Sequence, residues 1–87
     1  MPRLLFQHPV TDAENWASRH AERVELFAAW GSNVVSYVAA DGSNDVIVAV
    51  DVHDMAAMEA HMTSPEIVAA KQAHGVMEPI VIYGAAE

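Results

Sequence analysis

The sequence has 87 residues, 53% of them hydrophobic, and its four basic and twelve acidic residues give a formal net charge of −8. This charge repels nucleic-acid phosphates and anionic lipid surfaces, which argues against both as partners. The absence of cysteine excludes disulfides and thiolate metal sites. No apolar run reaches the roughly 18 residues of a membrane span and no signal peptide is recognisable, so the sequence predicts one cytoplasmic domain over residues 1–87.

A strand over residues 3–10 and a long helix are the first predicted elements. The helix lies between Thr11, which forms a capping-box pair with Glu14, and Gly31, a suitable left-handed residue at its end. One stripe of this helix contains Trp16, His20, Val24 and Phe27. His20 is therefore either a hydrogen-bonded core histidine or a residue that faces a cavity.

Two runs rich in β-branched residues, 33–40 and 45–52, flank Gly42-Ser43, which is typical of a two-residue hairpin turn. With this turn, Tyr37 pairs with Val48. One hairpin face then carries Val35, Tyr37, Ala39, Val46, Val48, Val50 and Val52. The opposite face is also mainly apolar, so we expect both faces to be covered, one by helices and the other by a second copy in a homodimer.

The next segment predicts two short helices separated by a break. Asp54 is a good N-cap for the first, which contains Met55, Met58 and Met62. Ser64 and Pro65 are start signals for the second, which runs to residue 74 before Gly75. The run after Pro79 is the last predicted strand.

The order strand, helix, strand, strand, helix, strand predicts an α+β fold of the ferredoxin-like βαββαβ type. Right-handed crossovers place the strands of a four-stranded antiparallel sheet in the order four, one, three, two, with the helices on one face. Dimerisation through the other face would then complete an α+β barrel.

The spacing HPVxDxxxWxxxHxxR in residues 8–23, the hairpin and the SPEIVAAKQAHGV segment at 64–76 resemble the dimeric α+β barrel superfamily. This superfamily includes antibiotic-biosynthesis-monooxygenase-like, stress-responsive barrel and muconolactone-isomerase-like proteins. The resemblance covers nearly the whole chain. It implies a cavity for an apolar or aromatic small molecule, which some members oxidise, isomerise or cyclise without a metal or flavin.

The five histidines show no metal-binding spacing, so we expect no metal, and the resemblance implies that no cofactor is needed. His53 and His74 lie at predicted element ends, where we expect them to be solvated. His20 and His61 are the candidate catalytic residues, because a neutral imidazole can act as a general base near pH 7.

The candidate substrate-binding residues share a predicted position between the helices and the sheet; they are His8, Trp16, Tyr37, Met58 and Met62. The predicted function is binding of an apolar, aromatic or polyketide-like small molecule by a protein that could be a cofactor-independent monooxygenase, isomerase or cyclase. The alternative is a non-catalytic ligand-binding or interaction dimer.

Overall fold

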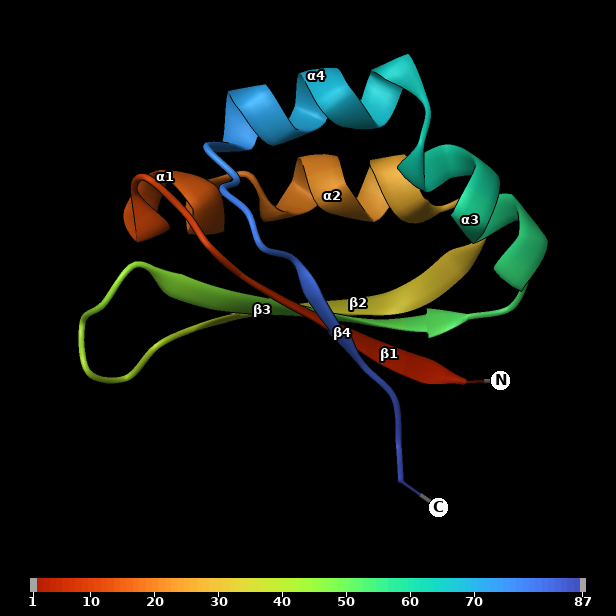
Figure 1. Cartoon of the computed structure of the whole chain (residues 1–87), viewed down its shortest axis with the longest axis horizontal. Helices are drawn as coiled ribbons and strands as arrows, with labels where there is room; N and C mark the ends of the chain where they lie inside the picture. The colour runs from red at the N-terminus through yellow and green to blue at the C-terminus, as the bar shows by residue number, and fades with distance from the viewer. Residues whose placement is uncertain (1, 87) are drawn as a thin grey trace.

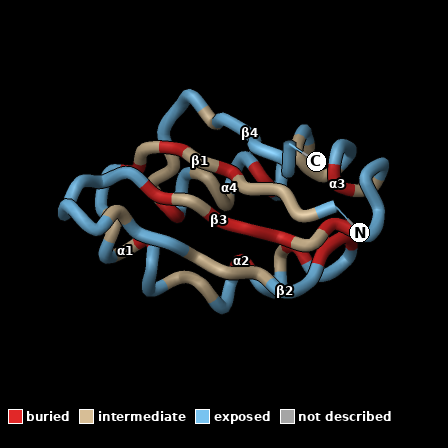
Figure 2. Tube along the Cα trace, turned by 90° about the horizontal axis from the view of Figure 1, so that it is seen from below, coloured by how far each residue is buried: buried red, intermediate tan, exposed pale blue. Residues whose placement is uncertain are grey.

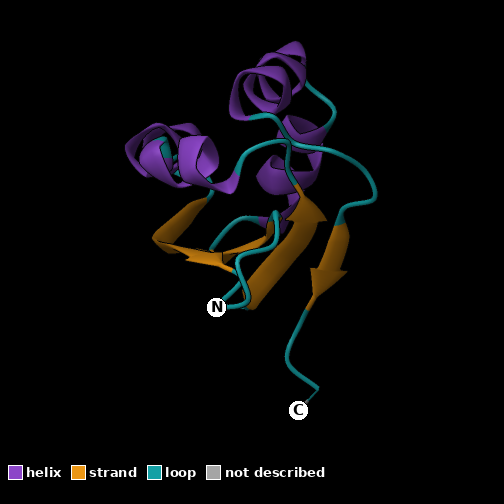
Figure 3. Cartoon of the chain, turned by 90° about the vertical axis from the view of Figure 1, so that its left-hand side faces the viewer, coloured by secondary structure: helices purple, strands orange, loops and turns teal. Residues whose placement is uncertain are grey.

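The computed structural model describes residues 2–86, which form a sheet with helices on one of its faces (Figures 1 and 3). The elements in chain order are β1 (Arg3–Pro9), α1 (Ala13–Ser18), α2 (His20–Phe27), β2 (Gly31–Val38), β3 (Asp45–Val52), α3 (Met55–Met62), α4 (Pro65–His74) and β4 (Val81–Tyr83). Within the described chain, every helix is too short or too polar to cross a membrane.

The four strands lie in the order β2-β3-β1-β4, and each neighbouring pair is antiparallel. This order confirms the ferredoxin-like arrangement. The core lies between the helix layer and the sheet, and its largest fully buried side chains are those of Trp16, Trp30, Val46, Val50 and Val52. Three of these belong to β3, because β3 is paired on both sides and covered by helices (Figure 2).

The first helical region differs from the expected single helix, because it is divided at Arg19 into α1 and α2. Asp12 rather than Thr11 is the N-cap, and its Oδ1 accepts from the Glu14 and Asn15 amides at 3.0 and 3.3 Å. The helix ends at Phe27, so Gly31 is not its C-cap but the first residue of β2.

The apolar stripe of this region was also misplaced, because Val24 is 42% exposed while Arg23 is 3% exposed. Helical geometry explains the exchange. Within α2, Arg23 lies four residues before Phe27 and shares its buried face, whereas Val24 is turned about 100° away from Arg23. An arginine thus occupies the place where the sequence pattern suggested an apolar residue.

The hairpin register is one residue away from the predicted register, since Tyr37 pairs with Ile47 and Ser36 with Val48. The predicted two-residue turn fails because Asn44 is held by other elements. Its carbonyl accepts from the Val10 amide at 2.8 Å, and its Oδ1 accepts from the Ala13 amide at 3.0 Å. A one-residue shift reverses the faces of a strand, so Tyr37 lies on the sheet face away from the helices.

The predicted break in the second helical region is confirmed. Ser64 Oγ accepts from the Ile67 amide at 3.3 Å, and Pro65 is the first residue of α4. Gly75 ends α4 with a φ of 70°, a left-handed conformation that glycine adopts without a Cβ penalty.

Candidate functional site

A cavity of about 70 Å³ lies between the helices and the sheet. Most of its wall is apolar and comes from Phe6, Trp16, Leu26, Phe27, Val48, Met62, Ile67, Ala70, Val76 and Ile80. Four ionisable side chains complete the wall: His8, Arg23, Lys71 and His74. An apolar wall with a few converging polar groups is the usual form of a small-molecule site.

Arg23 is the most unusual residue of this wall, because a guanidinium is rarely buried this completely. Its Cζ lies 3.8 Å from the centroid of the Trp16 ring, a distance typical of a cation–π contact. Its Nε and Nη2 donate to Ser36 Oγ at 3.3 and 3.0 Å, and Nη1 donates to His74 Nδ1 at 3.2 Å. Burial lowers the pKa of Arg23 to about 10, so the guanidinium is still charged at neutral pH.

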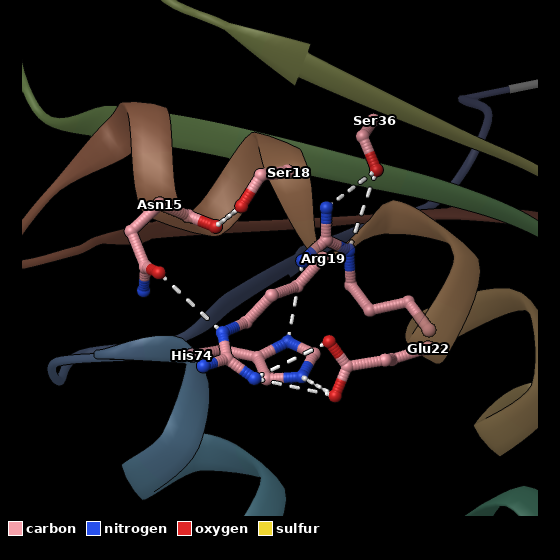
Figure 4. A network of polar contacts seen from close by, with 7 residues as sticks. Asn15, Ser18, Arg19, Glu22, Ser36 and His74 are labelled. Carbon is pink, nitrogen blue, oxygen red and sulfur yellow. Dashed lines mark hydrogen bonds and ion pairs between the residues drawn. The ribbon is translucent and has the colours of Figure 1, made fainter.

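Ser36 connects this guanidinium to His20. Because Ser36 Oγ accepts two hydrogen bonds from Arg23, its own hydrogen is available for His20 Nδ1, which lies 2.7 Å away. Figure 4 shows Ser36 and His74 on different sides of this network. The network therefore joins β2, α2 and α4 and holds the Arg23 side chain in one orientation.

His74 is 5% exposed and lies at the last residue of α4. Its Nδ1 accepts the hydrogen bond from Arg23, and its Nε2 lies 3.9 Å from Glu22 Oε1. Burial, followed by the positive charge of Arg23, lowers the pKa of His74, so this imidazole is neutral at pH 7. The expectation of a solvated His74 was therefore wrong, because α4 lies against α2 and buries its last turn.

His8 is also 5% exposed and makes an edge-on contact with Trp16, with ring centroids 6.0 Å apart. Its Nδ1 lies 3.4 Å from the carbonyl oxygen of Pro9. Since a carbonyl only accepts, Nδ1 carries the hydrogen and Nε2 keeps its lone pair. Burial lowers the pKa of His8, so a neutral imidazole with an available acceptor nitrogen borders the cavity.

The structure brings together only part of the predicted site. His8, Trp16 and Met62 line the cavity, whereas the other four candidates do not. Met58 is a core residue with 5% exposure, and Tyr37 is 50% exposed on the opposite sheet face because of the register shift.

The two histidines expected to be catalytic are engaged elsewhere. His20 does not line the cavity, and its Nδ1 is hydrogen-bonded to Ser36 Oγ. His61 Nδ1 accepts from Trp30 Nε1 at 2.8 Å, and its Nε2 lies 3.5 Å from Glu66. A histidine with both ring nitrogens near protein groups is typical of a structural residue. In residues 2–86, no three His, Asp or Glu side chains converge as metal ligands.

Arg23 and His74 were not among the predicted site residues. Arg23 could have been found, because it lies one helical turn before the apolar Phe27 and both are buried on the same face of α2. His74 carried no local signal, since its burial depends on a helix about 50 residues earlier in the chain.

Comparisons with known proteins agree with this fold. No family model and no curated protein matches the sequence. Among solved structures, SnoaB, a cofactor-independent oxygenase from Streptomyces nogalater, superposes with a TM-score of 0.72 at 14% identity, covering 99% of this chain and 93% of SnoaB. The chain has the antibiotic-biosynthesis-monooxygenase-like fold.

Two further structures with this fold are provisionally named antibiotic biosynthesis monooxygenases. The protein from Bordetella bronchiseptica has a TM-score of 0.70 at 12% identity, and the alignment covers 99% of this chain and 95% of the Bordetella chain. The protein from Nitrosomonas europaea has a TM-score of 0.66 at 17% identity, with 98% and 89% covered. The predicted resemblance is therefore confirmed at the level of the fold.

Proposed function

We propose that this antibiotic-biosynthesis-monooxygenase-like protein is a cofactor-independent oxygenase acting on an apolar aromatic small molecule, with His8 as general base. The observation that carries the proposal is the neutral, buried His8, whose Nε2 has no protein partner within the described residues and which borders an apolar cavity. The likeness to SnoaB supports the choice of oxygenation over isomerisation.

In the proposed reaction, His8 Nε2 takes a proton from an acidic C–H or O–H group of the substrate, and the electron pair stays on the substrate as a delocalised anion. The anion then reacts with O₂. For a ring CH₂ group, one oxygen atom ends as a carbonyl of the product and the other leaves as water, so the substrate supplies the electrons. The apolar wall keeps bulk water away from the anion.

The cavity must enlarge to take an aromatic ring system. Its volume of about 70 Å³ is below the roughly 300–1,000 Å³ of typical ligand sites. Met62 and Lys71 are the flexible side chains of its wall, and both are only partly buried. We expect these two residues to move when the ligand enters.

Oxygen consumption tests the proposed activity, with anthrone and hydroxylated naphthalenes as substrates. Replacing the base, His8→Gln, is expected to lower kcat by about 10²–10⁴-fold, whereas the exposed His53→Gln is expected to leave it unchanged. Because burial lowers the pKa of His8, the parent rate is expected to be constant above about pH 6.5 and to fall below it. No acceleration over buffer for any substrate, or full activity of His8→Gln, would contradict the proposal.

We propose further that two copies associate through the sheet face away from the helices. Figure 2 shows that no helix covers this face, and Figure 3 shows the chain after β4 projecting beyond it. Tyr37, Val81 and Tyr83 are 50%, 37% and 52% exposed there, beside the partly buried Leu5 and Ile47. Apolar surface of this kind is usually buried by a partner.

Light scattering at micromolar concentration tests the homodimer. The parent protein is expected at twice the chain mass of 9.4 kDa, and Ile47→Lys is expected to shift it toward the monomer because the lysine charge would be buried in the interface. A parent mass near 9.4 kDa would refute the homodimer.

A further inference from the structure

The cavity wall has a charge opposite to that of the whole chain. Two of the four basic residues, Arg23 and Lys71, line it, and none of the acidic residues that the structure describes does so. The chain as a whole carries twelve acidic residues and a net charge of −8. The wall is therefore a local positive region in an acidic protein, and it favours a negatively charged ligand.

Arg23 carries this charge without a carboxylate partner. Glu22, the acidic residue whose charge acts on Arg23, directs Oε2 to Arg19 Nη1 at 3.2 Å and Oε1 toward His74, and its side chain is 57% exposed. Among residues 2–86, no ion pair joins Arg23 to an acidic side chain. A buried charge is normally paired, so this guanidinium lacks the partner that its burial requires.

The hydrogen-bond count leaves room for that partner. A guanidinium has five N–H groups, and three of those of Arg23 are used by Ser36 and His74. One N–H of Nη1 and one of Nη2 remain. These two terminal nitrogens are the pair that binds carboxylate oxygens in a bidentate arrangement.

We infer that the cavity binds its ligand through an anionic oxygen on an aromatic ring, a carboxylate or a phenolate, which accepts the two remaining N–H groups of Arg23. The inference rests on the proposed function, because it names the substrate class of the same cavity. It assigns the ring of the ligand to the apolar part of the wall, which includes Phe6, Phe27 and Ile67. It also gives Arg23 a role after deprotonation, since the guanidinium stabilises the anion that His8 generates.

Fixed orientation distinguishes this site from a mobile surface arginine. The Arg23 Cζ lies over the Trp16 ring, and Ser36 and His74 accept hydrogen bonds from the guanidinium nitrogens. The pKa of His74 is lowered, so its neutral imidazole adds no competing charge. The site is thus organised before a ligand arrives, which reduces the entropic cost of binding.

The test uses benzoate and its neutral isostere benzamide, with titration calorimetry of the parent protein. Benzoate is expected to bind about 10- to 100-fold more tightly, the range of a charge-assisted hydrogen-bonded pair. Phenolate binding is tested separately with 4-nitrophenol, whose ionisation can be followed because its phenolate absorbs visible light. Bound nitrophenol is expected to ionise at least about one pH unit below free nitrophenol, the counterpart of a tenfold preference.

Arg23→Met removes the charge and keeps most of the apolar volume, so it is expected to abolish both preferences. Arg19→Met is the matched control, because Arg19 lies four residues before Arg23, does not line the cavity, and contacts only Asn15 and the exposed Glu22 through its side chain within the described residues. If Arg23→Met does not fold, the site is tested by NMR of the parent protein. Benzoate is then expected to shift the signals of the Arg23 side-chain nitrogens, and unchanged signals would overturn the anion site.

The outcomes separate the two proposals. Equal binding of benzoate and benzamide with no change in nitrophenol ionisation overturns the anion site and leaves the apolar cavity intact. A preference for benzoate alone or for nitrophenolate alone supports the site and identifies its anion. Binding of none of the three compounds overturns both the anion site and the proposed small-molecule function.

Discussion

Replacing Ser36 by alanine is expected to destabilise the protein mainly through Arg23. Ser36 Oγ is the acceptor for Arg23 Nε and Nη2, at 3.3 and 3.0 Å. The substitution leaves two donors of a buried cation without an acceptor, while His20, which is only partly buried, can bind water instead. Hydrogen bonds to charged groups contribute about 1.5–3 kcal/mol, and the longer of these two is the weaker.

We therefore expect Ser36→Ala to lower the free energy of unfolding by about 2–3 kcal/mol. For a domain of this length, that corresponds to a decrease in Tm of roughly 8–24 °C. The control is Ser32→Ala on the same strand, because Ser32 is exposed and its side chain makes no hydrogen bond within the described chain. Its effect is expected to stay within about 0.5 kcal/mol.

Urea denaturation at one fixed protein concentration measures both variants, since dimerisation would make stability depend on concentration. A double-mutant cycle isolates the contact with Arg23. In an Arg23→Met background, Ser36→Ala is expected to cost less than about 1 kcal/mol, because the donors are gone. If Ser36→Ala behaves like Ser32→Ala, or if its cost is the same in both backgrounds, the described network does not hold Arg23.

Three further outcomes are expected. Gly75→Ala is expected to destabilise by about 2–4 kcal/mol, because it adds a Cβ to a left-handed residue and places it against Thr11 Oγ1. His61→Leu is expected to cost about 1–3 kcal/mol, because it leaves the Trp30 Nε1–H group without its acceptor, and to leave benzoate binding unchanged. Because the pKa of folded His74 is lowered, its contribution to stability is fully present above about pH 6.5 and is lost as the pH falls, and His74→Gln is expected to reduce this dependence.

Each of these outcomes has its own control in urea denaturation. The control for Gly75→Ala is Gly42→Ala, because Gly42 has a φ of 82° and open space around it. Gly42→Ala is expected to lower the free energy of unfolding by about 1–2 kcal/mol, the cost of a left-handed alanine alone. An equal cost for Gly75→Ala would exclude a steric contact with Thr11. Altered benzoate affinity in His61→Leu would show that this histidine contributes to ligand binding. For the pH dependence, the control is His53→Gln, because His53 is exposed. If His74→Gln leaves the change in unfolding free energy with pH unaltered, His74 is already accessible to solvent.

The sequence alone determined the elements whose signals are local. Ser64, Pro65 and Gly75 defined α4, because an N-cap hydroxyl, a proline at the first helical position and a left-handed glycine each act within a few residues. The order of strands and helices, together with the right-handed crossover rule, then gave the strand order of the sheet and the side on which the helices lie.

The tertiary structure decided what depends on contacts between distant elements. The hairpin register follows from Asn44, which is bound to residues 10 and 13 instead of closing a tight turn, and this places Tyr37 on the face opposite to the cavity. Which residues form the site likewise depends on α4 lying over α2. There His74 accepts a hydrogen bond from Arg23, 51 residues earlier in the chain. Local periodicity cannot report such pairs, because the burial of a side chain is set by the element that covers it rather than by its own neighbours in sequence.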